Sequence, residues 1–339
     1  MKTVSVIILN WNGKQFLDDC LSSLKRQTFA DFEVILVDNG SHDGSVEFIK
    51  RNFNDFVILI ENKTNYGFAK GNNIGISYAT GRYIVLLNND TRVDPDFLKE
   101  LVVVAEEYPR VGMCAAKVYL DSGQRIIDTA GHLIYRDGLN RGRGRLEPDT
   151  GQYDTTEEVL FPSGSAALYK KEMLDEVGLF DEDFFAYGDD TDIGMKARLA
   201  GWACLYVPQA VVYHKYSGST SAYSPFKAFL VERNRIWIAV KYFPLAVLLL
   251  NPCYAFIRYV LQAYGALAHK GAAGRFAEEY SHGKLLAILL KAYLAAFKGL
   301  PKMWQKRRKI QKNTKVSRHE IYNWFDKFGI GVKELALKD

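Results

Sequence analysis

The chain has 339 residues, more than the roughly 100 to 200 that one domain usually takes, so we expect one large α/β domain with an appendage, or two domains. With 48% hydrophobic, 13% aromatic and 24% charged residues, it is neither disordered nor collagen-like. Its mean hydropathy of -0.13 is too polar for a protein with several membrane spans. The net charge of +5 is too small to indicate a nucleic-acid-binding protein.

The charge is unevenly distributed along the chain. Residues 301–318 contain eight lysines or arginines and no acidic residue, whereas the whole chain has 44 basic and 39 acidic residues. This short segment therefore makes the protein basic and leaves a net charge of -3 on the remainder. Clustered basic residues favour an anionic membrane surface as a partner.

The four cysteines (Cys20, Cys114, Cys204 and Cys253) are far apart and form no CxxC pair. This spacing argues against a structural zinc site and against a disulfide framework, so a reducing compartment is the simplest interpretation. The first apolar run, residues 4–9, is too short for the core of a signal peptide. We therefore expect a cytoplasmic protein, located at the inner face of the cell membrane if the basic segment binds lipid.

Short apolar and β-branched runs alternate with segments of helical spacing in the first part of the chain. Strands are predicted at residues 4–9, 33–37, 56–60 and 83–87, and helices at about 14–26, 45–52 and 69–79. Residues 121–160 carry scattered glycines and charges and predict a hairpin and loop excursion. Helices at about 170–177 and 190–200 and a strand within 203–213 complete a doubly wound α/β domain with a mainly parallel sheet.

The composition changes after about residue 224, where long apolar and aromatic stretches are interrupted by basic residues. Residues 242–257 contain no charge, but 16 residues interrupted by Pro252 fall short of the roughly 20 that span a bilayer. Residues 285–297 are apolar with a single lysine. We expect a domain at 1–223 and a helical region at 224–339 that lies in a membrane surface. The alternative is that these helices pack on the first domain or on a second subunit.

Polar residues follow three of the predicted strands, where an open α/β sheet binds its ligands. They are Asn10, Trp11, Asn12 and Gly13 after the first strand, Asp38, Asn39, Gly40 and Ser41 after the second, and Asn88, Asn89 and Asp90 after the fourth. Trp11 stands where a dinucleotide-binding turn needs a glycine, and no GxxxxGK[ST] loop occurs. These absences argue against a Rossmann dehydrogenase and against a P-loop nucleotide hydrolase.

Two of these acids suit a nucleotide ligand. Asp38 can accept hydrogen bonds from a ribose hydroxyl or a base N–H, although a helix cap or Asx turn is an equal alternative. Asp90, flanked by asparagines, can bind Mg²⁺ or Mn²⁺ through oxygen while substrate phosphates supply further ligands. Its alternative role is to stabilise a turn.

Residues 65–73 (NYGFAKGNN) place glycines, amides and a lysine at a predicted helix N-terminus, which presents free N–H groups to an anion. Asn65, Gly67, Lys70 and Asn73 are therefore candidates to bind the phosphates of a nucleotide. The alternative is that the glycines of this segment only allow close helix packing.

Three carboxylates, Asp189, Asp190 and Asp192, occur at the start of a predicted helix, which is more than a helix cap requires. One of them can act as a general base if it reaches a substrate hydroxyl, and a second acid nearby would raise its pKa. His214, after the last predicted strand, can supply a nitrogen ligand to the same metal; a purely structural histidine is the alternative.

The motifs VSVIILNWNG, VDNGS, NYGFAKGNN, LLNND and FFAYGDDTDIGMKARLAGW, followed by YH, resemble a family 2 glycosyltransferase of the GT-A fold. The resemblance covers residues 1–220 with the motifs in the same order and spacing. Within that family, NYGFAKGNN is most similar to bacterial rhamnosyltransferases that build polysaccharide or lipid-linked glycans.

The resemblance implies a role for each motif. Asp38 would contact the base or ribose, with the backbone around Asn10 and Asn12 framing the same pocket and Asn89 beside the donor. Asp90 is at the last position of the DxD motif, as metal ligand, although Asn88 stands where many relatives have a carboxylate. For the remaining motifs, the resemblance implies that Asp190 is the catalytic base and that His214 is a metal ligand. Asp189 replaces the commoner glutamate beside the base.

The implied reaction is a single inverting displacement on a nucleotide diphospho-sugar by a hydroxyl of a glycan or polyprenyl-linked acceptor, with Mg²⁺ or Mn²⁺ as cofactor. L-Rhamnose from TDP-rhamnose is the expected donor, and another UDP- or GDP-sugar is the alternative.

A sugar nucleotidyltransferase would need a glycine-rich, basic loop after the first strand, which residues 10–13 do not supply. A non-catalytic membrane-bound scaffold with the same fold is the alternative from a different class. Nothing in the sequence specifies an oligomeric state.

Overall fold

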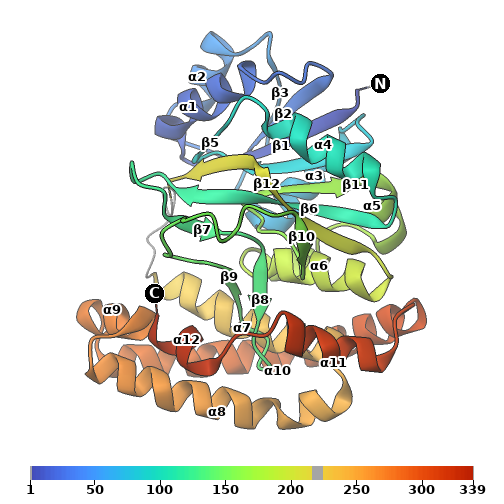
Figure 1. The fold of residues 1–339 in the computed structure, drawn as a ribbon. Helices are drawn as coiled ribbons and strands as arrows, with labels where there is room; N and C mark the ends of the chain where they lie inside the picture. The colour runs from blue at the N-terminus through green and yellow to red at the C-terminus, as the bar shows by residue number, and fades with distance from the viewer. Residues whose placement is uncertain (1, 216–223, 339) are drawn as a thin grey trace. The chain divides into compact units, whose positions relative to one another are not determined.

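A computed structural model describes residues 2–215 and 224–338, which form two compact units (Figure 1). The first unit contains, among the described residues, those up to 132, 142–198 and 202–215. The second contains residues 133–141, 199–201 and the helices after residue 224. The predicted boundary between 223 and 224 adjoins residues 216–223, which lie outside the described residues, so it stays a prediction.

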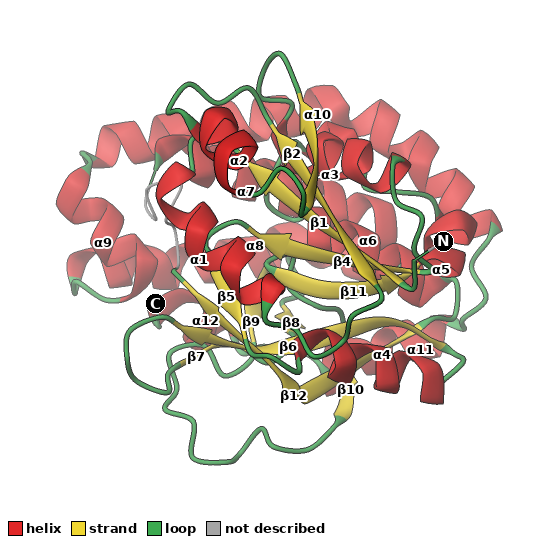
Figure 2. Ribbon diagram, turned by 90° about the horizontal axis from the view of Figure 1, so that it is seen from above, coloured by secondary structure: helices red, strands yellow, loops and turns green. Residues whose placement is uncertain are grey.

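The first unit is built on a mixed sheet with mostly parallel pairing at its centre. Its strands are β1 (Val4–Asn10), β2 (Phe32–Asp38), β3 (Val57–Glu61), β4 (Tyr83–Asn88), β5 (Thr91–Val93), β6 (Val111–Leu120), β7 (Ile127–Thr129), β10 (Glu157–Val159), β11 (Ala166–Lys170) and β12 (Ala203–His214). The order is β10-β12-β6-β11-β4-β1-β2-β3, with β5 added to β12 and β7 added to β6. Figure 2 shows β11, β4, β1 and β2 side by side.

The centre of this sheet explains the predicted strands. β1 pairs in parallel with both β2 and β4, and its residues are buried except for one of intermediate exposure, which is why the run is continuously apolar. The carboxyl ends of these three strands therefore meet at one edge. The four predicted N-terminal strands are confirmed to within one residue at each end, with β3 starting at Val57.

The helices of the first unit are α1 (Lys14–Lys25), α2 (Ser45–Asn52), α3 (Gly67–Ser77), α4 (Phe97–Glu107), α5 (Lys171–Val177) and α6 (Asp189–Leu199), with a short 3₁₀ turn at Glu182–Phe184. The helix α4 and the strands β6 and β11 have no counterpart in the sequence-based prediction. Since β6 (VGMCAAKVYL) mixes small residues with a lysine, it lacks the β-branched run that identifies β1. Its order comes from pairing with β11 and β12 on either side.

Close packing of α3 on the sheet explains two of its glycines. A Cβ on Gly71 would lie 2.4 Å from Leu9 Cδ1, and one on Gly75 would lie 2.5 Å from Ile7 Cγ2. A side chain at either position would push the helix away from β1. The packing interpretation of Gly71 is thus supported, whereas Gly67 has a different environment, described below.

The second unit is helical and includes one hairpin. Its helices are α7 (Pro225–Tyr242), α8 (Leu245–Leu267), α9 (Gly271–Glu279), α10 (His282–Lys312), α11 (Arg318–Lys327) and α12 (Val332–Leu337), and the hairpin is formed by β8 (His132–Ile134) and β9 (Asn140–Gly142). The sequence-based interpretation that Pro252 breaks the apolar run is wrong, because α8 continues for 23 residues through Pro252. Among the described residues, α8 is the one helix long and apolar enough to cross a membrane.

A buried charge cluster forms the centre of the second unit. The Arg258 side chain is fully buried, and its Nε donates to Asp137 Oδ2 in the hairpin at 2.6 Å. Its Nη1 donates to Glu232 Oε1 of α7 at 2.9 Å. Burial disfavours the charged form of Glu232, but Arg258 and Arg235 outweigh it and lower the pKa of Glu232 to about 2. The hairpin is therefore held among the helices by ion pairs that the sequence pattern did not predict.

Candidate active site

A buried network of polar side chains joins the carboxyl ends of β1, β2 and β4. Asn10 Nδ2 donates to Asp38 Oδ2 at 2.9 Å, and Asn89 Nδ2 donates to Asn10 Oδ1 at 2.7 Å. Asp38 Oδ1 also accepts from the backbone N–H groups of Gly40 (3.1 Å) and Ser41 (2.8 Å). Asp38 therefore forms the Asx turn that the sequence allowed. Contact with a base or ribose stays a prediction for it.

The loop after β1 is held against the loop after β2. The Asn12 backbone N–H donates to Ser41 Oγ at 2.8 Å, and Asn12 Oδ1 accepts from the His42 N–H at 2.8 Å. Asn12 has a left-handed backbone (φ 51°), a conformation that asparagine tolerates better than most residues. Asn10 is thus bonded to Asp38, and Asn12 to the loop that follows Asp38; that they frame a nucleotide pocket stays a prediction.

The start of α3 lies beside the loop that leads into α6. Gly67 has φ 80°, and its N–H donates to Asn65 Oδ1 at 2.9 Å. The Phe185 carbonyl accepts from the N–H groups of Phe68 (2.6 Å) and Ala69 (3.2 Å). Phe185 itself has φ 67°, and such strained residues concentrate at functional sites. Two N–H groups at the start of α3 therefore already donate to a protein carbonyl, so fewer N–H groups remain to bind an anion.

Two other candidates of this segment differ in their surroundings. Lys70 lies with its Nζ 4.6 Å from the ring centroid of Tyr66. The Asn73 amide donates to the Phe180 carbonyl at 2.9 Å and accepts from the Phe180 N–H at 3.0 Å. Asn73 therefore ties α3 to the segment before α6, which supports a structural role, and its contact with a nucleotide stays a prediction.

Asp90 and His214 meet because β12 pairs with β5, which places His214 opposite Thr91. His214 Nε2 lies 3.3 Å from Asp90 Oδ1, and both residues are buried. When two ligand atoms lie about 2.1 Å from one ion and the ligand–ion–ligand angle is about 90°, they are about 3.0 Å apart. The distance between Asp90 and His214 is close to this value, so the pair fits a divalent ion. Within the described residues no group of three His, Cys, Asp or Glu is arranged to hold a metal, so further ligands would come from substrate or water.

A third acidic residue, Asp128 of β7, lies on the other side of the His214 ring. Its Oδ2 is 2.8 Å from His214 Nδ1, and its Oδ1 forms an ion pair with Arg145. Burial disfavours charge on His214, but the hydrogen bonds and charges of Asp128 and Asp90 outweigh it and raise the pKa of His214 to about 10. The imidazole would therefore exchange a proton for a metal ion on binding.

Asp190 and Asp189 occupy different environments at the start of α6. Asp190 is half-buried, and its Oδ2 accepts from the Gly164 N–H at 3.4 Å and its Oδ1 from the Thr191 N–H at 2.7 Å. Asp189 is 5% exposed. Burial and the charge of Asp190 raise the pKa of Asp189 well above its usual range, so its protonated form is favoured. Of this pair, Asp190 is the more exposed.

Sequence reasoning missed Asp128 and His132, which both lie in the excursion at 121–160. His132 is 8% exposed, and its ring stacks on Phe161 with centroids 5.4 Å apart. Burial lowers the pKa of His132, while the charges of Asp190 and Asp128 act in the opposite direction. The charges of the candidate base and of the acid beside His214 therefore both act on His132. No local sequence pattern indicated that Asp128 would lie here, because β7, which carries it, has only three residues.

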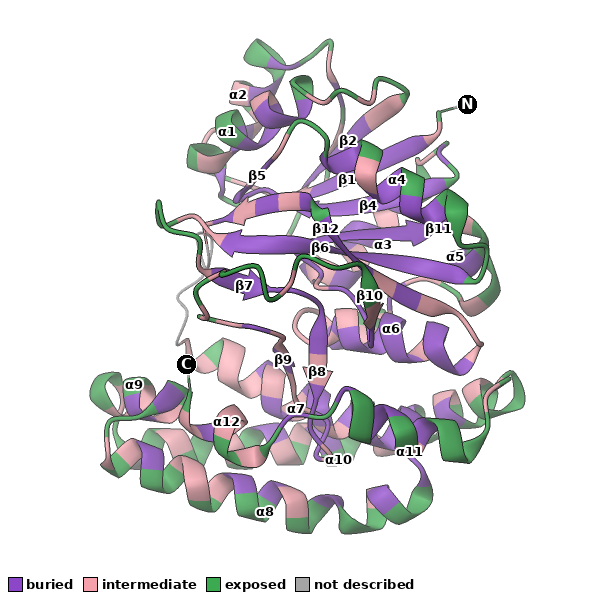
Figure 3. Ribbon diagram, in the orientation of Figure 1, coloured by how far each residue is buried: buried purple, intermediate pink, exposed green. Residues whose placement is uncertain are grey.

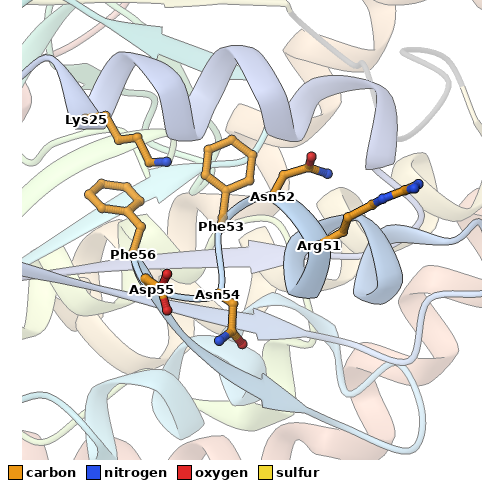
Figure 4. A pocket seen from close by; sticks show the side chains of 7 residues that line it. All are labelled: Lys25, Arg51, Asn52, Phe53, Asn54, Asp55 and Phe56. Atoms are coloured by element: carbon orange, nitrogen blue, oxygen red, sulfur yellow. The ribbon is translucent and has the colours of Figure 1, made fainter.

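A surface hollow of the first unit lies away from these residues (Figure 4). It is lined by Lys25, Arg51, Asn52, Phe53, Asn54, Asp55 and Phe56. Lys25 Nζ lies 4.5 Å from the Phe53 ring centroid. Because residues 51–56 precede β3, this hollow is at the amino-terminal edge of the parallel strands, opposite the edge that carries Asp38 and Asp90. It has none of the acids that the chemistry needs.

The chain is similar in sequence and in fold to several known proteins. An L-rhamnosyltransferase of Mycobacterium tuberculosis, named N-acetylglucosaminyl-diphospho-decaprenol L-rhamnosyltransferase, is 27% identical over 239 residues, which cover 63% of this chain and 76% of the relative. A crystal structure of GalNAc-T7 with UDP, GalNAc and Mn2+ superposes with a TM-score of 0.57 at 20% identity, covering 71% of this chain and 48% of that one.

A mannosyltransferase of Pyrobaculum calidifontis, PcManGT in complex with GDP-Man and Mn2+, superposes with a TM-score of 0.52 at 18% identity, covering 96% of this chain and 88% of that one. At these identities the structural likeness establishes the fold, which is the predicted GT-A fold. The sequence profile described as Glycosyl transferase family 2 matches residues 5–178, just over half of the chain. The chain therefore belongs to glycosyl transferase family 2.

Proposed function

We propose that this family 2 glycosyltransferase is a metal-dependent, inverting enzyme that moves a sugar from a nucleotide diphospho-sugar to a hydroxyl of a glycan or polyprenyl-linked acceptor in cell-surface polysaccharide synthesis. L-Rhamnose from TDP-rhamnose is the first candidate because the mycobacterial relative is named an L-rhamnosyltransferase. Other UDP- or GDP-sugars are the alternative, since the solved relatives hold UDP or GDP-Man.

The observation that carries the proposal is the pair of Asp90 and His214, with donor atoms 3.3 Å apart at the strand ends. A bound Mg²⁺ or Mn²⁺ ion would neutralise the charge that develops on the departing diphosphate. Asp90 and His214 would hold it from one side, and the donor's phosphates would complete its ligands. Asn10, Asn12 and Asp38 would frame the nucleotide, with Asn65, Gly67, Lys70 and Asn89 beside it.

Asp190 is the candidate base in this proposal. Its carboxylate is fixed by Gly164 and Thr191, and it is half-buried rather than closed off. It would take the proton of the attacking acceptor hydroxyl, so a single displacement inverts the anomeric carbon. Asp189 would stay protonated and support the helix start.

The neighbouring acids supply a matched test of the base. Asp190→Asn removes the proton acceptor, so we expect transfer to fall by about 10²-fold or more while nucleotide binding persists. Asp189→Asn imitates the protonated form of Asp189 and should keep most of the activity. Release of nucleoside diphosphate from TDP-rhamnose, UDP-sugars and GDP-sugars, with and without chelator, measures both variants. Full activity of Asp190→Asn would exclude it as base, and turnover of no donor would favour a non-catalytic scaffold.

A membrane surface is the proposed partner of the second unit. Leu286, Leu290, Leu294 and Phe297 of α10 follow one another at three- or four-residue spacing, and all are more than half exposed. Continued at the same spacing, this stripe reaches Trp304 and then the basic residues Arg308 and Lys312. An apolar stripe ending in an aromatic and basic residues is typical of a helix lying in an anionic interface.

The helix α8 presents a second such stripe. Leu249 is 80% exposed, and Phe256, Val260 and Leu267 are each more than half exposed. Figure 3 colours much of α8 as exposed or intermediate. Arg258 on its opposite side is bound inside the unit, so we propose that α8 lies in the surface rather than spanning it. Arg307 of the basic segment does not contribute to the proposed membrane-binding surface, because it is buried and donates to the Val240 carbonyl at 2.7 Å.

Vesicle sedimentation tests this partner. The double variant Leu290→Glu and Leu294→Glu should lose binding to phosphatidylglycerol vesicles, since both side chains are already exposed and their replacement spares the fold. Val103→Glu, at a comparably exposed residue of α4, is the matched control and should bind like the unaltered protein. Equal binding of all three proteins would refute the proposed face. If the unaltered protein bound neutral phosphatidylcholine vesicles as well as phosphatidylglycerol vesicles, the proposed role of the basic residues would be refuted.

A further inference from the structure

Asp128 connects His214 to the framework of the first unit. The two residues are 86 positions apart in the chain, and Asp128 Oδ2 lies 2.8 Å from His214 Nδ1. Both side chains are at least nine-tenths buried. The contact exists because β7 pairs antiparallel with β6, and β6 pairs in parallel with β12.

In the neutral imidazole, the contact determines which ring nitrogen carries the hydrogen. A carboxylate only accepts hydrogen bonds, so Nδ1 must be the donor toward Asp128. The Nε2 atom is then the one directed at Asp90, 3.3 Å away, and in the neutral imidazole it has the lone pair that a metal needs. Asp128 is not a third ligand, because it lies against the ring nitrogen opposite to the one that faces Asp90.

Asp128 is itself held in place. Its second oxygen forms an ion pair with Arg145, which follows the hairpin in the chain. A carboxylate clamped between a guanidinium and an imidazole has little freedom to turn. Partners of this kind orient metal-binding histidines and increase their basicity.

We propose that Asp128 is a positioning residue of the metal site, which holds the His214 ring in the tautomer and orientation that present Nε2 beside Asp90. The inference rests on the proposed function, because it assumes that Asp90 and His214 bind a divalent ion. The competing explanation is that Asp128 only balances the charge of Arg145 inside the fold.

Asp149 supplies a matched control for this distinction. It is also a buried acid of the excursion that contacts β6, accepting from Lys117 Nζ at 3.1 Å and from the Tyr119 hydroxyl. It is part of a separate ion-pair cluster that does not include His214. Asp149→Ala should therefore cost stability as Asp128→Ala does, without affecting the metal ligands.

The experiment titrates the full chain with Mn²⁺ in the presence of thymidine diphosphate and measures free Mn²⁺ by electron paramagnetic resonance. Asp128→Ala should weaken Mn²⁺ binding by about 10- to 100-fold. Asp128→Asn, which keeps an oxygen toward Nδ1 but loses the charge, should fall between Ala and the unaltered protein. Asp149→Ala should bind Mn²⁺ normally. In turnover, Asp128→Ala should need more Mn²⁺ for half-maximal rate while kcat recovers at saturating Mn²⁺.

The outcomes separate the inference from the proposed function. If Asp128→Ala binds Mn²⁺ normally while His214→Ala does not, the positioning role is wrong and the metal site stands. If Asp128→Ala and Asp149→Ala lose affinity equally, the effect is structural and the inference also fails. Absence of Mn²⁺ binding by the unaltered protein with thymidine, uridine or guanosine diphosphate would overturn the metal site and this inference together. Should Asp128→Ala not fold, unchanged Mn²⁺ affinity of Asp128→Asn would refute the role.

Discussion

Replacement of Gly67 by alanine tests how the start of α3 supports the segment that leads to Asp190. A Cβ on Gly67 would lie 2.5 Å from the Phe185 carbonyl oxygen and 2.7 Å from Phe185 Cδ2. Gly67 also has φ 80°, which alanine adopts at a cost. Gly123 is a matched control, because it has φ 75° and no atom lies within 4 Å of the position that its Cβ would take.

The two variants share the backbone cost but not the collision. A left-handed backbone costs alanine roughly 1–2 kcal/mol at either position. At Gly67 the nearest atom is a backbone oxygen, which no side-chain rotation can move, and overpacking of this kind adds about 1–3 kcal/mol. We therefore expect Gly67→Ala to destabilise the first unit by about 2–5 kcal/mol, against about 1–2 kcal/mol for Gly123→Ala.

Hydrogen exchange followed by mass spectrometry measures this difference, because peptides from α3 and α6 report the opening free energy of the first unit separately from the second. Activity should fall as well. Phe185 precedes Asp190 by five residues, and a shift of about 1 Å at a catalytic group can cost about 10²-fold in rate. Equal opening free energies and equal turnover for the Gly67→Ala and Gly123→Ala variants would refute the reasoning.

Three further predictions concern buried polar groups. Arg258→Met leaves Asp137 and Glu232 without their cation, so urea unfolding of the second unit should show a loss of about 3–5 kcal/mol, whereas Arg258→Lys should lose less. Because the pKa of Glu232 is lowered from 4.5 to about 2 by folding, its contribution is complete above pH 4.5 and is lost as the pH falls toward 2. This amounts to about 3 kcal/mol, and acid unfolding of the second unit that begins above pH 5 would contradict it. Asn73→Ala should cost about 1–3 kcal/mol in thermal unfolding by freeing the Phe180 backbone groups, while its affinity for thymidine diphosphate stays unchanged; a clear loss of affinity would restore Asn73 as a nucleotide contact.

Local sequence patterns were sufficient for the elements that carry the strand-end motifs. The first strand was predicted at residues 4–9 and occurs at Val4–Asn10, and α2 was predicted with its observed bounds. These elements are identified by short-range periodicity, which does not depend on what they pack against. The motifs that follow them were therefore located at the correct edge of the sheet.

Elements whose order depends on distant partners were missed. The strand β6 is stabilised by β11 and β12, and α8 continues past Pro252 because one side of it is anchored by Arg258. A proline in a helix interior is costly in isolation, so local rules end the helix there. Packing of the rest of α8 offsets that cost. A local rule cannot predict this packing, because it depends on residues far away in the sequence.

The candidate functional residues divide in the same way. Asp38, Asp90, Asp190 and His214 could be named from the sequence, because each follows or begins an element at the edge where an α/β sheet binds ligands. Which of them meet, and through which atoms, depended on strand pairing between β5, β6, β7 and β12. Asp128 became visible only there, since contacts across 86 residues of chain follow from the register of the sheet and leave no periodic trace in the sequence.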